Sequence, residues 1–194
     1  MRWVLATSNR GKQREFAALL EPLGISLVLQ SELGIESIPE TGLTFEANAL
    51  LKARHAALAS ALPALADDSG LEVDALAGRP GVWSARYAGE SATDEDNNAL
   101  LLRELQGVPA QRRTARYRCV LVLVRDAGDA RPVIAHGSWE GRIAERAAGD
   151  GGFGYDPLFL PAGQSGSAAQ LSADAKHSIS HRGKALAALV AQLR

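Results

Sequence analysis

Cysteine and net charge are both scarce in this chain, and each shortage excludes a class of protein. Cys119 is the only cysteine among 194 residues. No intrachain disulfide and no multi-cysteine zinc site can therefore form. The net charge is −1, whereas a domain that binds nucleic acid normally carries a strongly basic face. We expect a protein that binds neither DNA nor RNA.

Long apolar runs are also missing. The strongest one, Cys119 to Val124, is far shorter than the roughly 20 residues that a membrane-spanning helix needs. The apolar run before Thr7 is too short for the core of a signal peptide. We therefore expect a soluble, cytoplasmic protein without a membrane partner.

The order of apolar segments and turns predicts an α/β fold. Trp3–Ala6 is expected to form a buried strand, and apolar residues at helical spacing from Phe16 to Leu23 predict the helix after it. Ile25–Leu29 is expected to be the next strand, and a long helix follows at about residues 45–62. The length suits one domain, which we place over residues 1–194.

The second half of the chain continues the alternation. A helix is expected at about Thr93–Leu105, and a long central strand at Thr114–Val124 with Pro132–Ile143 as its hairpin partner. Gly149–Pro157 is a glycine-rich loop, and the last helix is expected at about Arg182–Leu193.

Two polar patterns are interpreted as surface features. Asn48, Lys52 and His55 share one face of the long helix. Leu51 and Leu58 are expected on the opposite stripe. Four arginines around the start of the long strand are assigned to an exposed strand edge or a subunit interface. They are Arg112, Arg113, Arg116 and Arg118.

The segment from Thr7 to Lys12 is a candidate anion site because it lies between a strand and the start of a helix. Free backbone N–H groups and the positive end of the helix dipole favour an anion there, and Lys12 adds a charge suited to a phosphate. The spacing is not that of a Walker A motif, so a P-loop NTPase is disfavoured. A capped helix start with a solvated lysine is the alternative. The candidate residues are Thr7, Ser8, Asn9, Arg10, Gly11 and Lys12.

Three acids form a candidate metal site: Glu40 lies before the long helix, and Asp67 and Asp68 follow it. Mg²⁺ takes oxygen ligands from one or two carboxylates together with substrate phosphates. Ala64–Glu72 is expected to be a strand that carries Asp67 and Asp68 at its end or in a bend. Ligand sites collect at strand ends in α/β folds. Loop acids without a ligand are the alternative.

The glycine-rich loop Gly149–Pro157 formally contains the spacing G-x-G-x-x-G. A dinucleotide-binding fingerprint requires a strand before it and a helix after it, whereas Asp156, Pro157 and an extended segment follow here. A glycine-flanked aromatic residue, Phe153, close to Asp156 better suits a loop that stacks on a base and reads its edge. A hairpin with core aromatic residues is the alternative.

Cations gather at the start of the last helix. His181 and Arg182 lie where a positive charge opposes the helix dipole, and Lys176 precedes them. Cations placed where they cost stability indicate a bound anion or the polar edge of a ligand. A tolerated surface pair is the alternative.

Taken in order, these motifs resemble the inosine triphosphate pyrophosphatase family, and the resemblance covers nearly the whole chain. The motifs that carry it are Ala6–Asn9 with Lys12, Glu40–Gly42 with Asn48 and Lys52, Ala66–Leu71, Ser84–Tyr87, Gly152–Pro157 and Ser180–Arg182. Ser8 departs from the bacterial pattern, in which glycine is common, and this conservative change puts little in doubt.

The resemblance implies a fold and an activity. The implied fold is a curved mixed β-sheet with flanking helices in two lobes around a central cleft, and the implied assembly is a homodimer. The implied activity is Mg²⁺-dependent hydrolysis of non-standard purine nucleoside triphosphates (dITP, ITP, XTP and dXTP) to the monophosphate and pyrophosphate. Water would attack the α-phosphorus while pyrophosphate leaves.

The resemblance also implies roles for the candidate residues. Glu40 and Asp68 would hold Mg²⁺, and Asp68 would accept the proton of the attacking water, while the role of Asp67 stays open. Asn48 and Lys52 match motif positions that face the cleft, and their individual roles also stay open. Residues 7–12 would hold the triphosphate. The other implied substrate contacts are Ser69, Phe153, Gly154, Tyr155, Asp156, Lys176, His181 and Arg182.

Base choice has a physical hypothesis. Hypoxanthine and xanthine present an N1–H donor and an O6 acceptor, so Asp156 is expected to accept from N1–H and Arg182, with His181, to donate to O6. Adenine offers the reverse pattern and would leave buried polar groups unpaired, which can reject a ligand by roughly 10⁴-fold. Guanine shares both groups, and its exclusion is left open.

Two other functions compete with this one. A nucleotide-binding sensor without turnover would not need the combination of Asp68, Glu40 and Lys12. A pyrophosphatase of the Maf-like type would prefer pyrimidine or modified nucleotides. A panel of substrates separates the three.

Overall fold

The structure is a computed structural model that describes residues 1–194, with the side chain of Glu15 left out. The chain divides into two compact units. Unit 1 consists of Met1–Asp68, Cys119–Gly137 and Gly183–Arg194, and unit 2 of Ser69–Arg118 and Ser138–Arg182. The single domain over the whole chain stays a prediction.

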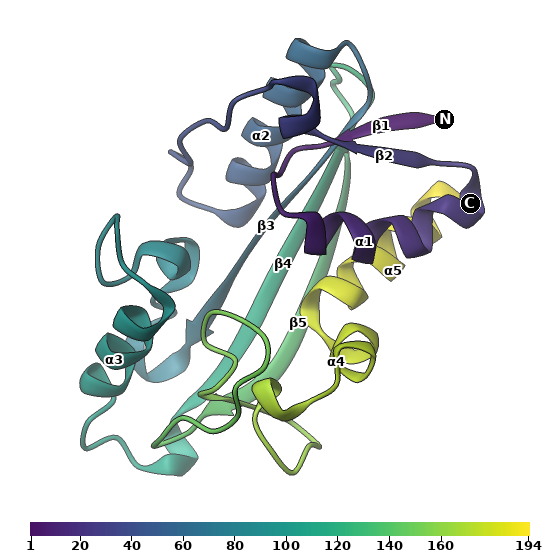
Figure 1. Cartoon of the computed structure of the whole chain (residues 1–194). Coiled ribbons are helices and arrows are strands. Elements are labelled where there is room, and N and C mark those ends of the chain that lie inside the picture. Colours follow the sequence, from purple (N-terminus) through teal and green to yellow (C-terminus); the bar gives the residue numbers. More distant parts are fainter. The chain divides into compact units, whose positions relative to one another are not determined.

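Six strands form one mixed sheet in the order β2-β1-β3-β4-β5-β6 (Figure 1). β1 runs parallel to both β2 and β3, and β5 runs antiparallel to β6. The strands are β1 (Arg2–Leu5), β2 (Ser26–Leu29), β3 (Ala64–Val73), β4 (Thr114–Val124), β5 (Val133–Ile143) and β6 (Phe159–Pro161). The expected mixed sheet with flanking helices is confirmed, and the implied cleft stays a prediction.

Five α-helices accompany the sheet in the described chain. They are α1 (Arg10–Leu20), α2 (Phe45–Ser60), α3 (Asp94–Glu104), α4 (Ala173–Ile179) and α5 (His181–Leu193). α2 ends before the expected Leu62, because Ala61 takes the left-handed conformation (φ 54°) as its C-cap. The short α4 was not expected, since seven mostly polar residues show no clear apolar stripe.

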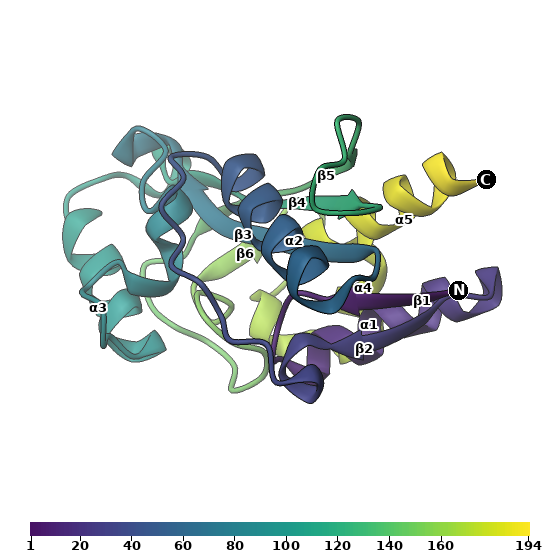
Figure 2. The ribbon, with the colours of Figure 1, turned by 90° about the horizontal axis from the view of Figure 1, so that it is seen from above.

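The core of unit 1 is built on both faces of its strands. Trp3 and Leu5 pack with Phe16 of α1 and Leu186 of α5 in one apolar cluster. Side chains alternate along a strand, so the buried Val4 points to the other face, where α2 packs against β1. Figure 2 shows α1 and α2 on opposite sides of β1.

The prediction of a leucine stripe on α2 is wrong. Leu58 is 75% exposed, and Leu51 is also exposed, whereas Asn48 is fully buried. Alanines supply most of the buried face instead, because small side chains let the helix approach the sheet. These are Ala49, Ala53, Ala56 and Ala57. An exposed leucine is common on protein surfaces, so residue type alone did not identify the buried stripe.

The strand expected over Ala64–Glu72 is confirmed, but the expected position of Asp67 and Asp68 at its end or in a bend is wrong. Both lie inside β3, which continues without a bend from Ala64 to Val73. Both side chains are almost completely buried, at 2% and 7% exposure. A strand tolerates buried carboxylates only where cations or donors compensate them, and both acids have a lysine partner.

The arginines of β4 do not mark a strand edge, because β4 lies between β3 and β5. Arg113 is buried and donates to the carbonyl oxygens of Val108 (2.9 Å), Ala144 (3.1 Å) and Leu105 (2.9 Å). One charged side chain thereby satisfies three carbonyl groups. The edge assignment of this arginine is therefore wrong.

Unit 2 has its own aromatic core. The Tyr117 ring packs against Phe159 at 4.8 Å between centroids and against His181 at 4.8 Å. Trp139 lies 5.2 Å from Phe159 and 6.4 Å from His181. The first residue of α5 therefore belongs to the packed interior of this unit.

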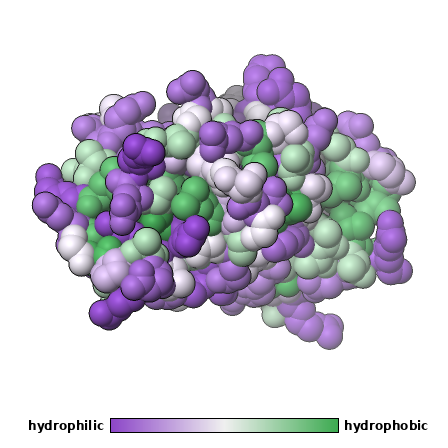
Figure 3. Space-filling view, turned by 90° about the horizontal axis from the view of Figure 1, so that it is seen from below, coloured by the Kyte–Doolittle hydropathy of each residue, from purple (hydrophilic) through white to green (hydrophobic). Residues whose placement is uncertain are grey.

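The surface seen from below is mainly hydrophilic, with apolar residues in separate groups between the polar ones (Figure 3). None of the helices that the described residues form is long and apolar enough to span a membrane.

Arg113→Ala is expected to lower the free energy of unfolding by about 3 kcal/mol, because three carbonyl groups lose their donor. Arg112→Ala is the matched control: this neighbour is exposed, and its effect should stay within about 0.5 kcal/mol. Urea denaturation measures both. Equal effects in the two variants would contradict the bridging role.

Candidate active site

The segment before α1 begins the helix as predicted, but it caps itself. Asn9 is the N-cap, and its Oδ1 accepts from the backbone N–H of Gly11 (2.8 Å) and of Lys12 (3.1 Å). The expectation of free N–H groups is therefore wrong at these two positions. Thr7 accepts from the N–H of Asn9 at 3.2 Å. The side chains of Arg10 and Lys12 are the cations of this segment.

Lys12 forms an ion pair with Asp67 on β3. Its Nζ lies 2.9 Å from Oδ1 and 2.8 Å from Oδ2 of the carboxylate. Asp67 is almost fully buried, whereas about a quarter of the Lys12 side chain is exposed. The buried acid therefore holds the lysine at the surface of the unit. This partner distinguishes Asp67 from its neighbour Asp68, which pairs with a different lysine.

Asp68 and Glu40 share a second lysine. Lys52 Nζ lies 2.5 Å from Glu40 Oε1 and 3.3 Å from Asp68 Oδ1. Burial raises the pKa of the Asp68 carboxyl to about 6, and the Glu40 charge adds to this, while Lys52 and Asn48 lower it. Burial alone would lower the pKa of Lys52, but the carboxylates of Asp68, Asp67 and Glu40 raise it.

Asn48 positions the segment that carries Glu40. Its Oδ1 accepts from the N–H of Gly42 at 2.7 Å, and a Cβ at position 42 would lie 2.6 Å from that same oxygen. Only glycine leaves room for this contact. Asn48 also lies close enough to Asp68 to lower the pKa of that carboxyl. The fully buried asparagine thus arranges the acids, and its contact with substrate stays a prediction.

The acids suit a hard divalent cation. Glu40 and Asp68 supply carboxylate oxygens, and the Oδ2 of Asp68 is buried without a hydrogen-bond partner among the described side chains. No group of three or more His, Cys, Asp or Glu among those side chains could hold a metal. Two carboxylates with further oxygens from a substrate are what Mg²⁺ takes, so the residues fit the expected ion.

Unit 2 carries a cavity of about 150 Å³ beside the glycine-rich loop. It is lined by Ser69, Gly70, Ser84, Ala85, Asp94, Tyr117, Phe153, Gly154, Tyr155, His181 and Arg182. The structure thus brings together six of the residues expected to contact substrate. Asp156 and Lys176 do not line this cavity, although both contact Phe153.

Phe153 presents an aromatic ring to solvent, at 55% exposure. Lys176 Nζ lies 4.6 Å and the Arg182 Cζ 5.6 Å from the centre of the ring. Cations over an aromatic face are attracted by its electron density. The exposed ring and these two cations together suit a flat ligand that carries polar edge atoms.

Asp156 organises the loop from inside. It is 2% exposed, and its Oδ2 accepts from the Phe153 N–H at 2.8 Å and from Lys176 Nζ. Gly152 has φ 76°, and a Cβ there would lie only 2.1 Å from the same oxygen. The carboxylate therefore fixes both the loop and Lys176.

Tyr117 is a residue that the sequence analysis missed. Its ring stacks on His181 at an angle of 11°, and its hydroxyl is hydrogen-bonded to the Asp156 carboxylate. Burial raises the pKa of Tyr117 well above its usual value, and the Asp156 charge raises it further. An aromatic residue in a central strand normally indicates core packing, so no signal in the sequence distinguished it.

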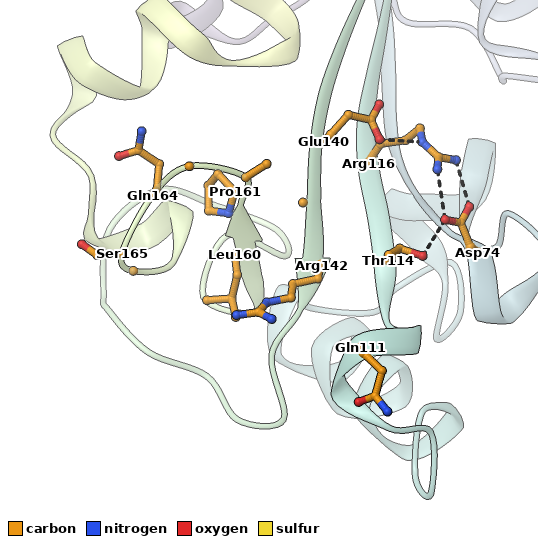
Figure 4. A pocket seen from close by; sticks show the side chains of 14 residues that line it. Asp74, Gln111, Thr114, Arg116, Glu140, Arg142, Leu160, Pro161, Gln164 and Ser165 are labelled. Carbon is orange, nitrogen blue, oxygen red and sulfur yellow. Dashed lines mark hydrogen bonds and ion pairs between the residues drawn. The ribbon is translucent and has the colours of Figure 1, made fainter.

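A second cavity of unit 2, of about 680 Å³, lies apart from these residues (Figure 4). Arg116 lies at its side, where Asp74 and Glu140 each approach its guanidinium to 3.0 Å. Two carboxylates thus oppose this one guanidinium. The smaller cavity suits an aromatic ligand better, because the exposed Phe153 ring lines it.

The paired acids and lysines of unit 1 suit a phosphorylated ligand, and the cavity of unit 2 suits an aromatic one. A sequence profile described as "Ham1 family" matches residues 3–192. The chain belongs to the Ham1 family.

Individual relatives agree with this. A dITP/XTP pyrophosphatase of Salmonella typhimurium is 56% identical over 191 residues, covering 98% of this chain and 97% of that protein. The dITP/XTP pyrophosphatase of Escherichia coli K12 is 54% identical, with the same coverage. A HAM1 protein from Coxiella burnetii superposes with a TM-score of 0.95 at 45% identity, covering 100% of this chain and 98% of the other. The family resemblance predicted from the motifs is confirmed.

The burial of Asp68 predicts a pH dependence of stability. A carboxyl group whose pKa is raised in the folded state costs stability once it ionises, so this cost grows as pH rises from about 4 to about 6. Asp68→Asn should therefore stabilise the metal-free protein at pH 7.5, by up to about 3 kcal/mol, and have little effect at pH 4.

Urea denaturation at the two pH values measures this difference. Asp67→Asn is the control, because that carboxylate lies 2.8 Å from Lys12 and its loss should destabilise the protein at pH 7.5. Destabilisation by Asp68→Asn at pH 7.5 would refute the cost assigned to this acid.

Proposed function

We propose that this protein hydrolyses non-standard purine nucleoside triphosphates, namely dITP, ITP, XTP and dXTP, to the nucleoside monophosphate and pyrophosphate. The observation that carries the proposal is the buried Asp68 carboxyl beside Glu40, with an uncommitted oxygen and a pKa of about 6. Relatives at 54% and 56% identity, each covering 98% of the chain, are named dITP/XTP pyrophosphatase.

Asp68 is the proton acceptor in this mechanism. A general base is most effective when its pKa lies near the working pH, and a carboxyl with a pKa of about 6 is ionised at neutral pH yet more basic than an exposed aspartate. Its Oδ2 takes the proton of the water that attacks the α-phosphorus. Lys52 stays beside the carboxylate, and its positive charge offsets the repulsion between the Glu40 and Asp68 carboxylates.

The triphosphate carries negative charge that the protein must balance. Lys12, held by Asp67 at 2.8 Å, and Lys176, held by Asp156, supply fixed positive charges for it. Preorganised charges of this kind stabilise a transition state without reorganisation at the moment of reaction. Mg²⁺, when held by Glu40 and Asp68, would neutralise the phosphate oxygens further.

Base recognition falls to the cavity of unit 2. Phe153 stacks on the purine, and Arg182 with His181 donates to O6. Asp156 does not line the cavity and is 2% exposed, so we assign it a different part from direct contact with N1–H. It holds Lys176 and the N–H of Phe153, and thereby fixes the geometry that reads the base.

The wider setting is also proposed. A lone cysteine, Cys119, which is buried in the structure, fits a reducing compartment, and we assign the protein to the cytoplasm. We propose Mg²⁺ as its cofactor and a homodimer as its assembly. Light scattering after gel filtration measures the mass of the assembly, and a mass of one chain would contradict the dimer.

A substrate panel tests the proposed function. All common and deaminated triphosphates are incubated with the protein and Mg²⁺, and the products are separated by chromatography. Release of dIMP and pyrophosphate from dITP is expected. Preference for dUTP or dTTP would favour a Maf-like enzyme, and nucleotide binding without turnover would favour a sensor.

Asp68→Asn should reduce kcat for dITP by at least about 10³-fold, because the proton acceptor is lost. Binding of dITP should change only a few-fold, since the lysines remain. Steady-state kinetics and equilibrium dialysis measure the two effects. Asp67→Asn is the matched variant: it loosens Lys12 and should act mainly on KM. Near-normal turnover in Asp68→Asn would show that Asp68 is not the proton acceptor.

Phe153→Ala should raise KM about tenfold for every purine substrate, because stacking on an aromatic ring contributes about 1–3 kcal/mol per base without selecting among bases. Phe153→Tyr keeps the ring and should stay near the wild type. Kinetics with dITP and XTP measure the change. An unaltered KM in the alanine variant would refute stacking.

A further inference from the structure

One face of α3 binds both polar groups of Gly154, the residue that follows Phe153. Asp94 Oδ2 accepts from the Gly154 N–H at 2.5 Å, and Asn98 Nδ2 donates to the Gly154 carbonyl at 2.9 Å. Asp94 and Asn98 are four residues apart, so they lie on the same face of the helix. One helix therefore holds the backbone of the loop by both its donor and its acceptor.

The orientation of the Asn98 amide is unambiguous. Its Nδ2 also donates to the Asp94 carbonyl at 2.8 Å, and both of its partners are carbonyl oxygens that can only accept. A flipped amide would place Oδ1 against two acceptors. Oδ1 is buried without a partner among the described side chains, so the side chain leaves one group unsatisfied while it links α3 to the loop.

The contact with α3 restrains the residue after Phe153, in addition to the hydrogen bond of the Phe153 N–H to Asp156, and the chain at that point is permissive. Gly154 has φ 59°, and glycine loses more backbone freedom on ordering than any other residue. The Phe153 side chain is largely exposed and meets cations over its ring. The direction of that ring is therefore decided by the backbone that carries it.

We propose that Asp94 and Asn98 are positioning residues for base binding: by gripping the Gly154 peptide groups, they hold the Phe153 ring in place before the nucleotide arrives. This inference rests on the proposed function, because it takes Phe153 as the stacking residue. A preformed stacking surface lowers the ordering cost of binding. It acts equally on the bound substrate and the transition state, so its loss should raise KM and leave kcat unchanged.

Asp94→Ala and Asn98→Ala test the proposal in the full-length protein with dITP and Mg²⁺. Each should raise KM about three- to tenfold, as expected for one hydrogen bond, with kcat within twofold of wild type. Asn98→Asp keeps the shape but replaces the donor by an acceptor, so its KM should rise at least as much. Asp94→Asn keeps an acceptor oxygen and should restore KM. Glu95→Ala is the matched control, because this neighbour is exposed.

Hydrogen–deuterium exchange of residues 149–157 without nucleotide gives a readout that does not depend on activity. Exchange should be faster in both alanine variants, at an unchanged melting temperature. Wild-type KM with wild-type exchange would overturn the proposal, and so would a loss confined to kcat. If the wild type fails to hydrolyse dITP, the proposed function fails by itself. Faster exchange would then still support the grip on the loop, and unchanged exchange would overturn it.

Discussion

The candidate site of unit 1 depends on two buried carboxylates that each need their own cation. Asp67 and Asp68 are consecutive residues of β3, so their side chains point to opposite faces of the strand. Lys12 of α1 neutralises the first, at 2.8 Å, and Lys52 of α2 neutralises the second, at 3.3 Å. Without these two helices, one on either side, a strand could not hold two adjacent acids in its interior.

The two acids therefore have different duties, although their neighbourhood in the sequence is the same. Asp67 fixes Lys12, because both of its carboxylate oxygens accept hydrogen bonds from Lys12 Nζ. Asp68 keeps one buried oxygen without a partner among the described groups, and its ionisation is opposed by burial. The role we propose for Asp68 follows from this difference between the two acids. Two consecutive aspartates look equivalent in the sequence, so the pattern does not predict which of them has the oxygen without a partner.

The sequence predicted much of the fold, and six of the expected substrate contacts line one cavity of unit 2. Runs such as Thr114–Val124 gave the right bounds because alternation and apolar continuity are local properties. Most of what failed were properties set by distant partners. The buried face of α2 and the burial of Asp67 and Asp68 inside β3 depend on neighbours far along the chain, whereas the cap that Asn9 gives to α1 is local and was simply missed. Gly154 was expected at the base, but its grip by Asp94 and Asn98 joins segments 56 and 60 residues apart, which no local spacing reveals.

The raised pKa of Asp68 means that the ionised carboxylate that the proposed chemistry uses lowers the stability of the folded protein. A population of random variants screened only for survival of heat would be enriched in chains that have lost this carboxyl, because its charge is a burden to the folded molecule. Natural proteins commonly keep such burdens where activity requires them. If Asp68 has the role proposed for it, engineering of heat resistance in this protein needs a simultaneous selection for turnover.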